Sequence, residues 1–209
     1  MQQDWQSQME TFQTMVDRSR RVVFFGGAGV STASGIPDFR SADGLYSEDF
    51  GELTPEMMLS SSFFYLHPAQ FFAYYRTHML YPEARPNAAH LKLYEMEVAD
   101  RLRGIVTQNV DGLHRMAGNI RLYELHGSVH VNTCMDCGDV YDLQWMLNNH
   151  EEIPHCPHCG GVVKPSVVLY GEPMDKYVCM GACRELGNAD LLIVAGTSLM
   201  VEPAASFLK

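Results

Sequence analysis

The sequence predicts an α/β fold: a Rossmann-like parallel sheet with an inserted smaller domain that combines a helical module and a zinc ribbon. Three observations predict it. A β-rich run at 21–25 ends abruptly in four small residues, Gly-Gly-Ala-Gly, which is how a doubly wound sheet usually begins. Two more buried-strand candidates, 104–107 and 191–195, also end in small or polar residues. Two Cys-x-x-Cys pairs at 134–137 and 156–159 mark a metal-binding insert.

The elements can be justified in chain order. Trp5, Met9, Phe12 and Val16 recur at helical spacing, so residues 4–20 are predicted as an amphipathic helix. This helix leads into the first of the three strands. Because the carboxyl ends of parallel strands meet at one edge of a sheet, the polar tips of the three strands are expected to form one ligand crevice.

The segment 52–100 predicts short helices, because prolines interrupt an aromatic- and Met-rich helical pattern. Such a stripe most often packs as core or as a lid. Residues 131–165 carry four cysteines and few long apolar runs, which predicts a separate small module. The predicted large domain comprises 1–40, 91–130 and 166–209, and the predicted small domain comprises 41–90 and 131–165.

Length and composition are those of a globular protein. The 209 residues suggest one large domain, or one with a small appendage, at about 150 residues per domain. Apolar residues make up 46% and charged residues 19% of the chain, which argues against disorder. The formal charge of −10 and the lack of a Lys/Arg-rich run argue against nucleic-acid binding and against attachment to anionic lipid. An acidic protein favours a cationic partner, such as a lysine-bearing peptide.

The cellular location expected from the sequence is the cytoplasm. The first ten residues lack the basic and apolar regions of a secretion signal. The aliphatic run at 191–195 is far too short to cross a bilayer. The six cysteines are therefore expected in metal or packing roles rather than in disulfides. These patterns leave the oligomeric state open.

The two cysteine pairs predict a structural zinc ion. Cys134, Cys137, Cys156 and Cys159 form two Cys-x-x-Cys knuckles with 18 residues between them, a spacing typical of a four-thiolate zinc site. Four protein ligands leave no open position for water, so such a zinc is structural rather than catalytic. The alternatives are a redox-active dithiol or buried thiols. His155 and His158 flank the second pair and could replace a sulfur, whereas Cys179 and Cys183 are expected to pack on a helix.

The glycine loop predicts an approach for a phosphate group. Gly27, Ala28, Gly29 and Ser31 follow the first strand, where missing side chains let backbone amides approach a pyrophosphate. The third glycine of the dinucleotide fingerprint is absent, so a purely structural turn remains open. The polar loop at 34–41 lies where a dehydrogenase would place a regular helix, and it is expected to close over a ligand.

Six ordered blocks resemble the signature motifs of the sirtuins, the NAD-dependent protein lysine deacylases. They are GAGVSTASGIPDFRSADGLY at 27–46, TQNVDGLH at 107–114, LHGS at 125–128, the paired Cys-x-x-Cys motifs, VLYGE at 168–172 and GTSL at 196–199. The blocks occur in the order found in the family and extend over most of the chain. The resemblance implies a deacylase that consumes NAD and releases nicotinamide, O-acyl-ADP-ribose and free lysine.

The resemblance also implies roles for individual residues. His126 matches the general base of the family, with Asn109 and Asp111 as further catalytic residues; capping of a following helix is the alternative for Asn109 and Asp111. The residues implied to bind NAD are Gly27, Ala28, Gly29, Ser31, Asp38, Phe39, Arg40, Gln108, Asn109, Asp111, Gly196, Thr197 and Ser198. The zinc implied is one structural ion per chain, held by the four cysteines named above.

The partner implied is an acyl-lysine peptide or protein. By resemblance, the substrate residues are Val168, Leu169, Tyr170, Gly171 and Glu172, where a peptide would add as a strand. An ordinary buried strand is the alternative. Relatives that prefer succinyl or malonyl groups carry a Tyr and an Arg where this chain has Phe72 and Tyr75. An acetyl or another uncharged acyl group is therefore expected.

Other activities stay open at this stage. ADP-ribosyl transfer would use the same site, and a non-catalytic module that binds NAD or ADP-ribose would need no base. A hydride-transferring Rossmann enzyme is the weakest candidate. Sirtuins continue past the GTSL block with another strand and a loop that contact the adenosine, whereas this sequence ends at Lys209. We therefore expect weaker NAD binding than in the longer family members.

Overall fold

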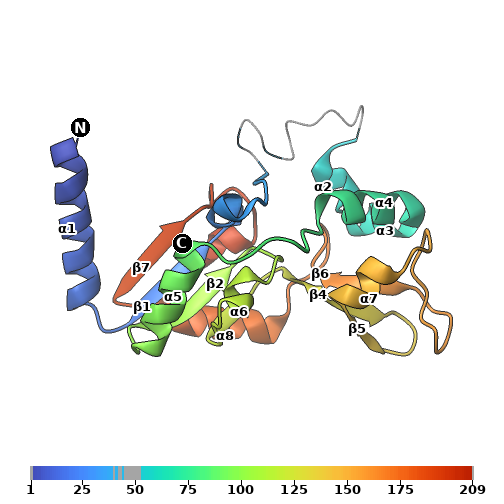
Figure 1. Cartoon of the computed structure of the whole chain (residues 1–209). Helices are drawn as coiled ribbons and strands as arrows, with labels where there is room; N and C mark the ends of the chain where they lie inside the picture. Colours follow the sequence, from blue (N-terminus) through green and yellow to red (C-terminus); the bar gives the residue numbers. More distant parts are fainter. Residues whose placement is uncertain (1, 40, 42–43, 45–52, 209) are drawn as a thin grey trace.

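The computed structural model describes residues 2–39, 41, 44 and 53–208. It contains two β-sheets, each with its own helices, which lie next to each other along the long axis of the molecule (Figure 1). The larger sheet is parallel and the smaller one is antiparallel. The predicted α/β class with a Rossmann-like parallel sheet is confirmed.

The parallel sheet has the strand order β3-β2-β1-β7. Its central strand β1 (Val22–Gly26) is buried along its whole length, because it pairs with β2 (Leu102–Thr107) on one side and β7 (Leu191–Ala195) on the other. β3 (Leu122–Glu124) pairs with β2. A strand covered on both faces needs an almost continuous apolar sequence, which explains the run of valines and phenylalanines in β1.

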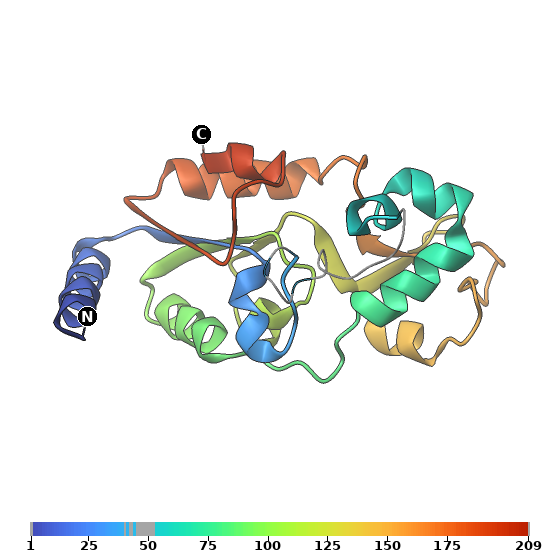
Figure 2. The same ribbon diagram turned by 90° about the horizontal axis from the view of Figure 1, so that it is seen from above.

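Helices cover both faces of this sheet (Figure 2). On one face, α5 (Ala88–Val98) packs Leu93 against Val22, Phe24 and Ile105. The other face is covered by α8 (Lys176–Gly187) and the short helix η4 (Ala204–Leu208). The glycine turn after β1 continues into two short helices, η1 (Ala28–Val30) and η2 (Thr32–Ser34). The loop after β2 leads into α6 (Leu113–Met116).

The small sheet has the order β5-β4-β6. Its strands are β4 (Gly127–Cys134), β5 (Val140–Asp142) and β6 (Val163–Val167), and α7 (Leu143–Asn148) follows β5. The predicted domain boundaries at 130/131 and 165/166 fall inside β4 and β6. The division into two discontinuous domains stays a prediction.

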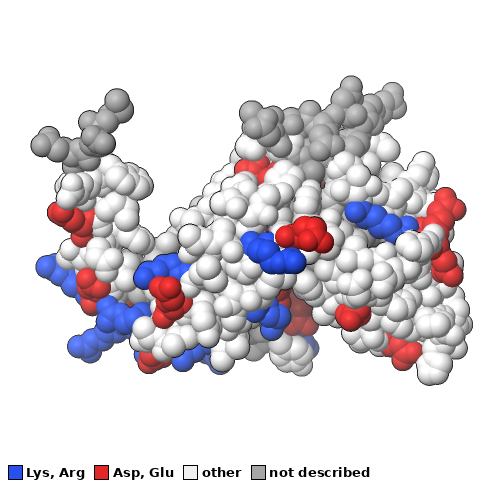
Figure 3. Space-filling view, in the orientation of Figure 1, with Lys and Arg blue, Asp and Glu red and all other residues white. Residues whose placement is uncertain are grey.

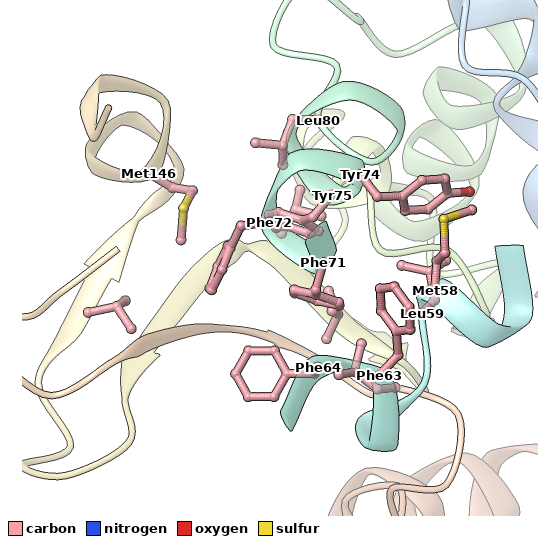
Figure 4. Close-up of a cluster of buried hydrophobic side chains, with 14 of the residues drawn as sticks. Met58, Leu59, Phe63, Phe64, Phe71, Phe72, Tyr74, Tyr75, Leu80 and Met146 are labelled. Atoms are coloured by element: carbon pink, nitrogen blue, oxygen red, sulfur yellow. The ribbon is translucent and has the colours of Figure 1, made fainter. Parts of the chain in front are cut away.

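The helical module consists of α2 (Pro55–Met58), α3 (Ser61–Leu66) and α4 (Pro68–His78). Each helix begins at a recognisable signal, such as the Ser60 hydroxyl that accepts a hydrogen bond from the Phe63 amide of α3. Phe71, Phe72 and Tyr75 are completely buried. Together with Phe64 they form the aromatic core that joins the helices to the small sheet (Figure 4). The core reading of the aromatic stripe is confirmed.

Helix α1 (Gln2–Arg18) extends away from the rest of the molecule (Figures 1 and 2). The predicted helix is present, and Trp5, Met9 and Phe12 on its apolar stripe are exposed. Its C-terminus is held by the Arg101 guanidinium, which donates to the carbonyls of Val16 and Asp17.

Charged side chains of both signs are interspersed over the face drawn in Figure 3. Among the described residues, no helix combines the length and apolarity that crossing a membrane requires.

Candidate active site

A cavity of about 570 Å³ lies between the carboxyl ends of β1, β2 and β7 and the helical module with residues 167–172. The predicted residues that line it are Gly27, Ala28, Gly29, Ser31, Asp38, Phe39, Gln108, Asn109, Asp111, His126, Val168, Leu169, Tyr170, Gly171, Glu172, Gly196, Thr197 and Ser198. Arg40, also predicted for this site, lies outside the described residues. The structure therefore brings together segments that are far apart in the chain, from Gly27 to Ser198, as the convergence of strand ends predicts.

The glycine turn and the end of β7 are joined by backbone hydrogen bonds. The amide of Gly27 donates to the Ala195 carbonyl at 3.1 Å, and the amide of Gly29 donates to the Gly196 carbonyl at 2.9 Å. A Cβ atom on Gly27 would lie 2.7 Å from the Gly196 carbonyl oxygen, and one on Gly29 would lie 2.9 Å from the Gly196 Cα. These glycines therefore allow the two strand ends to pack closely. The amides of Gly27 and Gly29 are already paired within the protein, whereas the sequence leads us to expect that they approach a pyrophosphate.

Beneath the cavity, a buried hydroxyl joins two loops. The Ser31 side chain is fully buried, and its hydroxyl donates to the Asp111 carboxylate at 2.6 Å. The same oxygen accepts from the Asn109 side-chain amide at 3.0 Å. The second carboxylate oxygen of Asp111 accepts from the Leu113 amide at the start of α6. The N-cap of α6 is Gly112, so Asp111 binds the first helical amide from the position before the cap, while it also lines the cavity.

The tips of β2 and β7 are joined by side chains. The Gln108 amide donates to the Thr197 hydroxyl at 2.9 Å. The hydroxyl of Thr197 in turn accepts from the Leu199 amide. These contacts hold the loop after β7 against the loop after β2, so that the cavity has a continuous polar wall.

His126 lines the cavity, and a hydrogen bond defines which of its ring nitrogens carries the proton. Its Nδ1 lies 2.9 Å from the Gln108 carbonyl oxygen. Because a carbonyl oxygen only accepts, Nδ1 carries the proton and Nε2 keeps its lone pair. Desolvation lowers the pKa of His126, and this outweighs the hydrogen bond to Gln108, which raises it. The imidazole is therefore neutral and available as a base near pH 7.

Glycine is required immediately after His126. Gly127 has a φ of +74°, and a Cβ atom there would lie 2.0 Å from the Ser166 carbonyl oxygen. The His126 carbonyl accepts from the Val168 amide at 2.9 Å. The turn that carries the imidazole is thus attached directly to the predicted substrate segment.

All residues of the predicted substrate segment, 168–172, line the cavity. The Tyr170 amide donates to the Leu59 carbonyl, and the Tyr170 carbonyl accepts from the Ser61 amide. One edge of the segment is thus paired with the helical module. The Glu172 carboxylate accepts from the Leu169 amide of its own segment at 3.0 Å and from the Lys164 ammonium of β6 at 3.1 Å.

The cavity also has walls that sequence reasoning missed. Leu59, His78, Met79 and Tyr81 reach it from the helical module. No motif marks them, because they share only the aromatic-rich pattern of that region and become neighbours of the site through packing. The remaining unpredicted lining residues are Ile36, Pro37, Val110, Val167, Met174, Val201, Glu202 and Pro203.

His130 supports the site from outside the cavity. Its Nε2 lies 3.0 Å from the Asp111 carbonyl, and its ring fills the space where a Cβ atom of Gly112 would lie. His130 has no role among the residues predicted from the sequence. No sequence pattern distinguishes His130 from an ordinary strand residue.

The four predicted zinc ligands form one cluster. The sulfur atoms of Cys134, Cys137, Cys156 and Cys159 all lie within 4.8 Å of one another. Two of the pairs are 3.4 Å and 3.7 Å apart, near the edge of about 3.8 Å that a tetrahedron with 2.3 Å zinc–sulfur bonds requires. The residues therefore fit a structural zinc site, and zinc is the metal cofactor of this chain.

The two neighbouring histidines do not belong to this cluster. His155 lies 3.2 Å from the Glu151 carboxylate and His158 lies 2.9 Å from the Asp139 carboxylate. Cys179 and Cys183 lie on α8, away from the four ligands. The all-cysteine ligand set is thus favoured over the mixed one.

Fold and site together define a dinucleotide-binding α/β protein with a structural zinc module. The model of the Sir2 family matches residues 27–203, and the chain belongs to this family. It is 50% identical over 196 residues to an NAD-dependent protein deacetylase of Clostridium acetobutylicum, with 93% of this chain and 80% of that protein covered. The identity to the protein of the same name in Clostridium perfringens is also 50%, with the same shares covered.

Solved structures agree in the fold. A Sir2 structure with a peptide and NAD⁺ is 34% identical, with a TM-score of 0.82, and the match covers 95% of this chain and 80% of that one. A Sir2 variant with a deacetylated peptide and 3′-O-acetyl ADP ribose is 33% identical, with a TM-score of 0.87 and the same coverage.

Proposed function

We propose that this chain is an NAD-dependent protein lysine deacetylase, which releases nicotinamide and O-acetyl-ADP-ribose. The observation that carries the proposal is His126: a neutral imidazole of defined tautomer, which faces a cavity formed by the ends of β1, β2 and β7. The relatives named NAD-dependent protein deacetylase and the Sir2 structures with peptide and NAD⁺ support it.

The residues of the cavity fit a dinucleotide. Its volume of about 570 Å³ is within the range of small-molecule sites, and its walls combine a backbone-lined turn at Gly27–Gly29 with hydroxyl and amide groups at Ser198 and Asn109. When bound, NAD supplies a ribose carbon with a good leaving group, nicotinamide. Residues 27–31 and 196–198 would surround its phosphates, with the Gly27 and Gly29 amides paired inside the protein rather than donated to them. Gln108, Asn109 and Asp111 would hold the nicotinamide ribose.

The chemical task of His126 is to accept a proton from a ribose hydroxyl at Nε2. Its Nδ1–H stays bonded to the Gln108 carbonyl and keeps the ring oriented. Burial keeps the imidazole neutral until a proton is offered. Phe39 lines the same cavity and is positioned to exclude water from the reacting carbon.

The acyl group that fits is uncharged. The charged residues that line the cavity in the described part of the chain are Asp38, Asp111, Glu172 and Glu202, all acidic. Phe72 and Tyr75, at the positions where succinyl-preferring relatives carry their Tyr and Arg, are buried in the small-domain core. A carboxylate on the acyl group would find like charges, whereas an acetyl group meets no such cost.

The proposed substrate is an acetyl-lysine peptide or protein that lies along residues 168–172. The proposal includes the cytoplasm as the place of the reaction, because thiolates that bind zinc need a compartment in which cysteines stay reduced.

Mass spectrometry of the reaction products tests this function. With NAD and an acetyl-lysine peptide, we expect the peptide to lose the acetyl mass while nicotinamide is released, and the variant His126→Ala to do neither. A peptide or protein that gains the mass of ADP-ribose would instead indicate ADP-ribosyl transfer. NAD binding without any product would indicate a non-catalytic module, and NADH absorbance would indicate hydride transfer.

A further inference from the structure

A partly buried ion pair lies behind the proposed substrate segment. Lys164 in β6 and Glu172 at the end of the segment are 3.1 Å apart, and their side chains are 15% and 24% exposed. We propose that Lys164 and Glu172 are positioning residues, which hold residues 167–172 in the shape that receives an acyl-lysine peptide. This inference rests on the proposed deacetylase function.

All three N–H donors of the Lys164 ammonium have acceptors in this region. They are the Pro165 carbonyl at 3.3 Å, the Val167 carbonyl at 3.1 Å and the Glu172 carboxylate at 3.1 Å. An ammonium group has no further hydrogen to donate. Lys164 thus binds Val167 at the start of the segment and Glu172 at its end at the same time.

Glu172 closes the segment into a turn. Its carboxylate accepts from the Leu169 amide at 3.0 Å, while its own amide donates to the Leu169 carbonyl at 2.9 Å. Between them, Gly171 has a φ of +91°, which suits a tight turn. Leu169 is only 3% exposed, so loss of the carboxylate would leave its amide without a partner in a buried position.

The same lysine connects the segment with the rest of the small domain. Its ammonium lies 5.9 Å from the centre of the Phe64 ring of α3. Its neighbour Val163 pairs with the zinc ligand Cys134 in the β4–β6 ladder. Lys164 therefore connects the small sheet and the helical module with residues 167–172 on the peptide side of the cavity.

The geometry separates this role from direct contact with substrate. Glu172 lines the cavity, whereas Lys164 does not. A change at Lys164 can therefore alter peptide binding only through the segment that it holds. The turn at 27–31 and residues 196–198 come from other strands, so the NAD side of the cavity should not respond.

The test compares steady-state constants of Lys164→Met with those of the intact chain. We expect the KM for the acetyl-lysine peptide to rise about tenfold, as the loss of one hydrogen-bonded charge predicts. The KM for NAD, and the kcat when both substrates saturate, should stay within about twofold. Lys164→Arg keeps the charge and should recover most of the peptide affinity. Lys92→Met breaks an exposed pair with Glu95 on α5 and serves as the matched control.

Binding of a labelled acetyl-lysine peptide in the presence of ADP-ribose provides a readout without turnover. Lys164→Met and Glu172→Gln should each weaken it, and the double variant should be no weaker than the worse single one, since both remove the same link. Equal rises in the KM for NAD and for peptide, or an unchanged peptide affinity in Lys164→Met, would overturn the proposal. Should Lys164→Met not fold, Glu172→Gln and Lys164→Arg carry the comparison. Failure of the proposed function is a separate result: the intact chain would release no nicotinamide.

Discussion

At the scale of single residues, His126 and His114 show how burial sets a protonation state. Desolvation lowers the pKa of both imidazoles. His126 keeps a hydrogen bond to a carbonyl and faces the cavity. His114 is only 2% exposed and packs against His90 at a ring-centre distance of 4.6 Å. Desolvation therefore keeps His126 neutral as a base, whereas at His114 it makes the free energy of unfolding depend on pH.

The pH profile of kcat/KM should report the lowered pKa of His126. The acid limb is expected below pH 6.5, about the value of a free histidine, because more acid is needed to protonate the buried ring. His126→Ala should lower kcat by about a hundredfold or more, while His150→Ala on the surface should leave it unchanged. An acid limb clearly above pH 6.5 would contradict a desolvated base.

The pH dependence of folding should report His114. Burial, with a smaller contribution from His90, lowers its pKa to about 3, whereas the unfolded chain has a histidine pKa of about 6.5. Between these values the unfolded state binds more protons, so the free energy of unfolding falls as the pH drops below about 6.5. One such group contributes a slope of at most about 1.4 kcal/mol per pH unit. Urea unfolding at several pH values should show a smaller slope for His114→Gln, and an identical slope would refute this assignment.

At the scale of elements, close contacts between strand ends and the cysteine knuckles decide where the loops lie. The end of β1 can approach the loop after β7 only because Gly27, Gly29 and Gly196 carry no side chains. In the small sheet, β4 ends at the first Cys-x-x-Cys knuckle, and β6 begins a few residues after the second one. Both arrangements are local, and both can be broken by a single substitution.

Gly27→Ala should lower stability and weaken NAD binding. The added methyl would meet the Gly196 carbonyl at 2.7 Å and the Thr197 Cβ at 2.8 Å, an overpacking that typically costs about 1–3 kcal/mol. Gly35→Ala is the matched control, because it has only the strain of a φ of +83° and open space around it. Urea unfolding and calorimetric titration with ADP-ribose measure the two effects. Equal ADP-ribose affinity in Gly27→Ala and the intact chain would show that this contact does not shape the site.

Removal of one zinc ligand should unfold the small sheet and abolish activity. Cys137→Ser leaves three sulfurs, and structural zinc sites contribute folding free energy directly. Cys183→Ser, on α8 outside the cluster, should retain one zinc per chain. Metal content by atomic emission, together with thermal unfolding, distinguishes the two variants. Full activity of zinc-free Cys137→Ser would show that the module is dispensable.

At the scale of the whole molecule, the cavity is formed between the parallel sheet on one side and the small sheet with the helical module on the other. One wall consists of strand ends from the parallel sheet, and the other of residues 167–172 and the helical module. The carboxylates that line it come from four different segments. Selectivity for the acyl group is therefore a property of the assembled molecule rather than of one motif.

Deacylation rates should decrease from acetyl to succinyl peptides of the same sequence. The carboxylates of Asp38, Asp111 and Glu202 line the cavity and Glu172 is paired with Lys164, so a negatively charged acyl group meets like charges. We expect kcat/KM for the acetyl peptide to exceed that for the succinyl peptide by at least about tenfold, which corresponds to 1.4 kcal/mol. Competition between the two peptides, followed by mass spectrometry, measures the ratio. A preference for succinyl would show that a cation reaches the acyl group.

Much of this protein could be predicted from local patterns. The apolar run of β1 and the small residues after it indicate a buried strand and a turn, because backbone sterics and burial act over a few residues. The spacing of Cys134, Cys137, Cys156 and Cys159 indicates tetrahedral thiolate coordination, because two Cys-x-x-Cys pairs supply four sulfur ligands. The resemblance to the sirtuin motifs assigns Ser31, Asn109, Asp111 and His126 to the site, and the structure brings all of them to one cavity.

Other features arise only when distant segments pack. Leu59, His78 and Tyr81 reach the cavity because the aromatic core fixes the helical module against the small sheet. The amides of Gly27 and Gly29 are paired because β7 lies beside β1, and Glu172 turns into its own segment because β6 places Lys164 behind it. Local sequence patterns therefore specify the strands, the turn and the metal ligands, because each of them is marked by residues close together in the chain. The walls of the cavity depend on burial and hydrogen bonding between residues far apart in the chain.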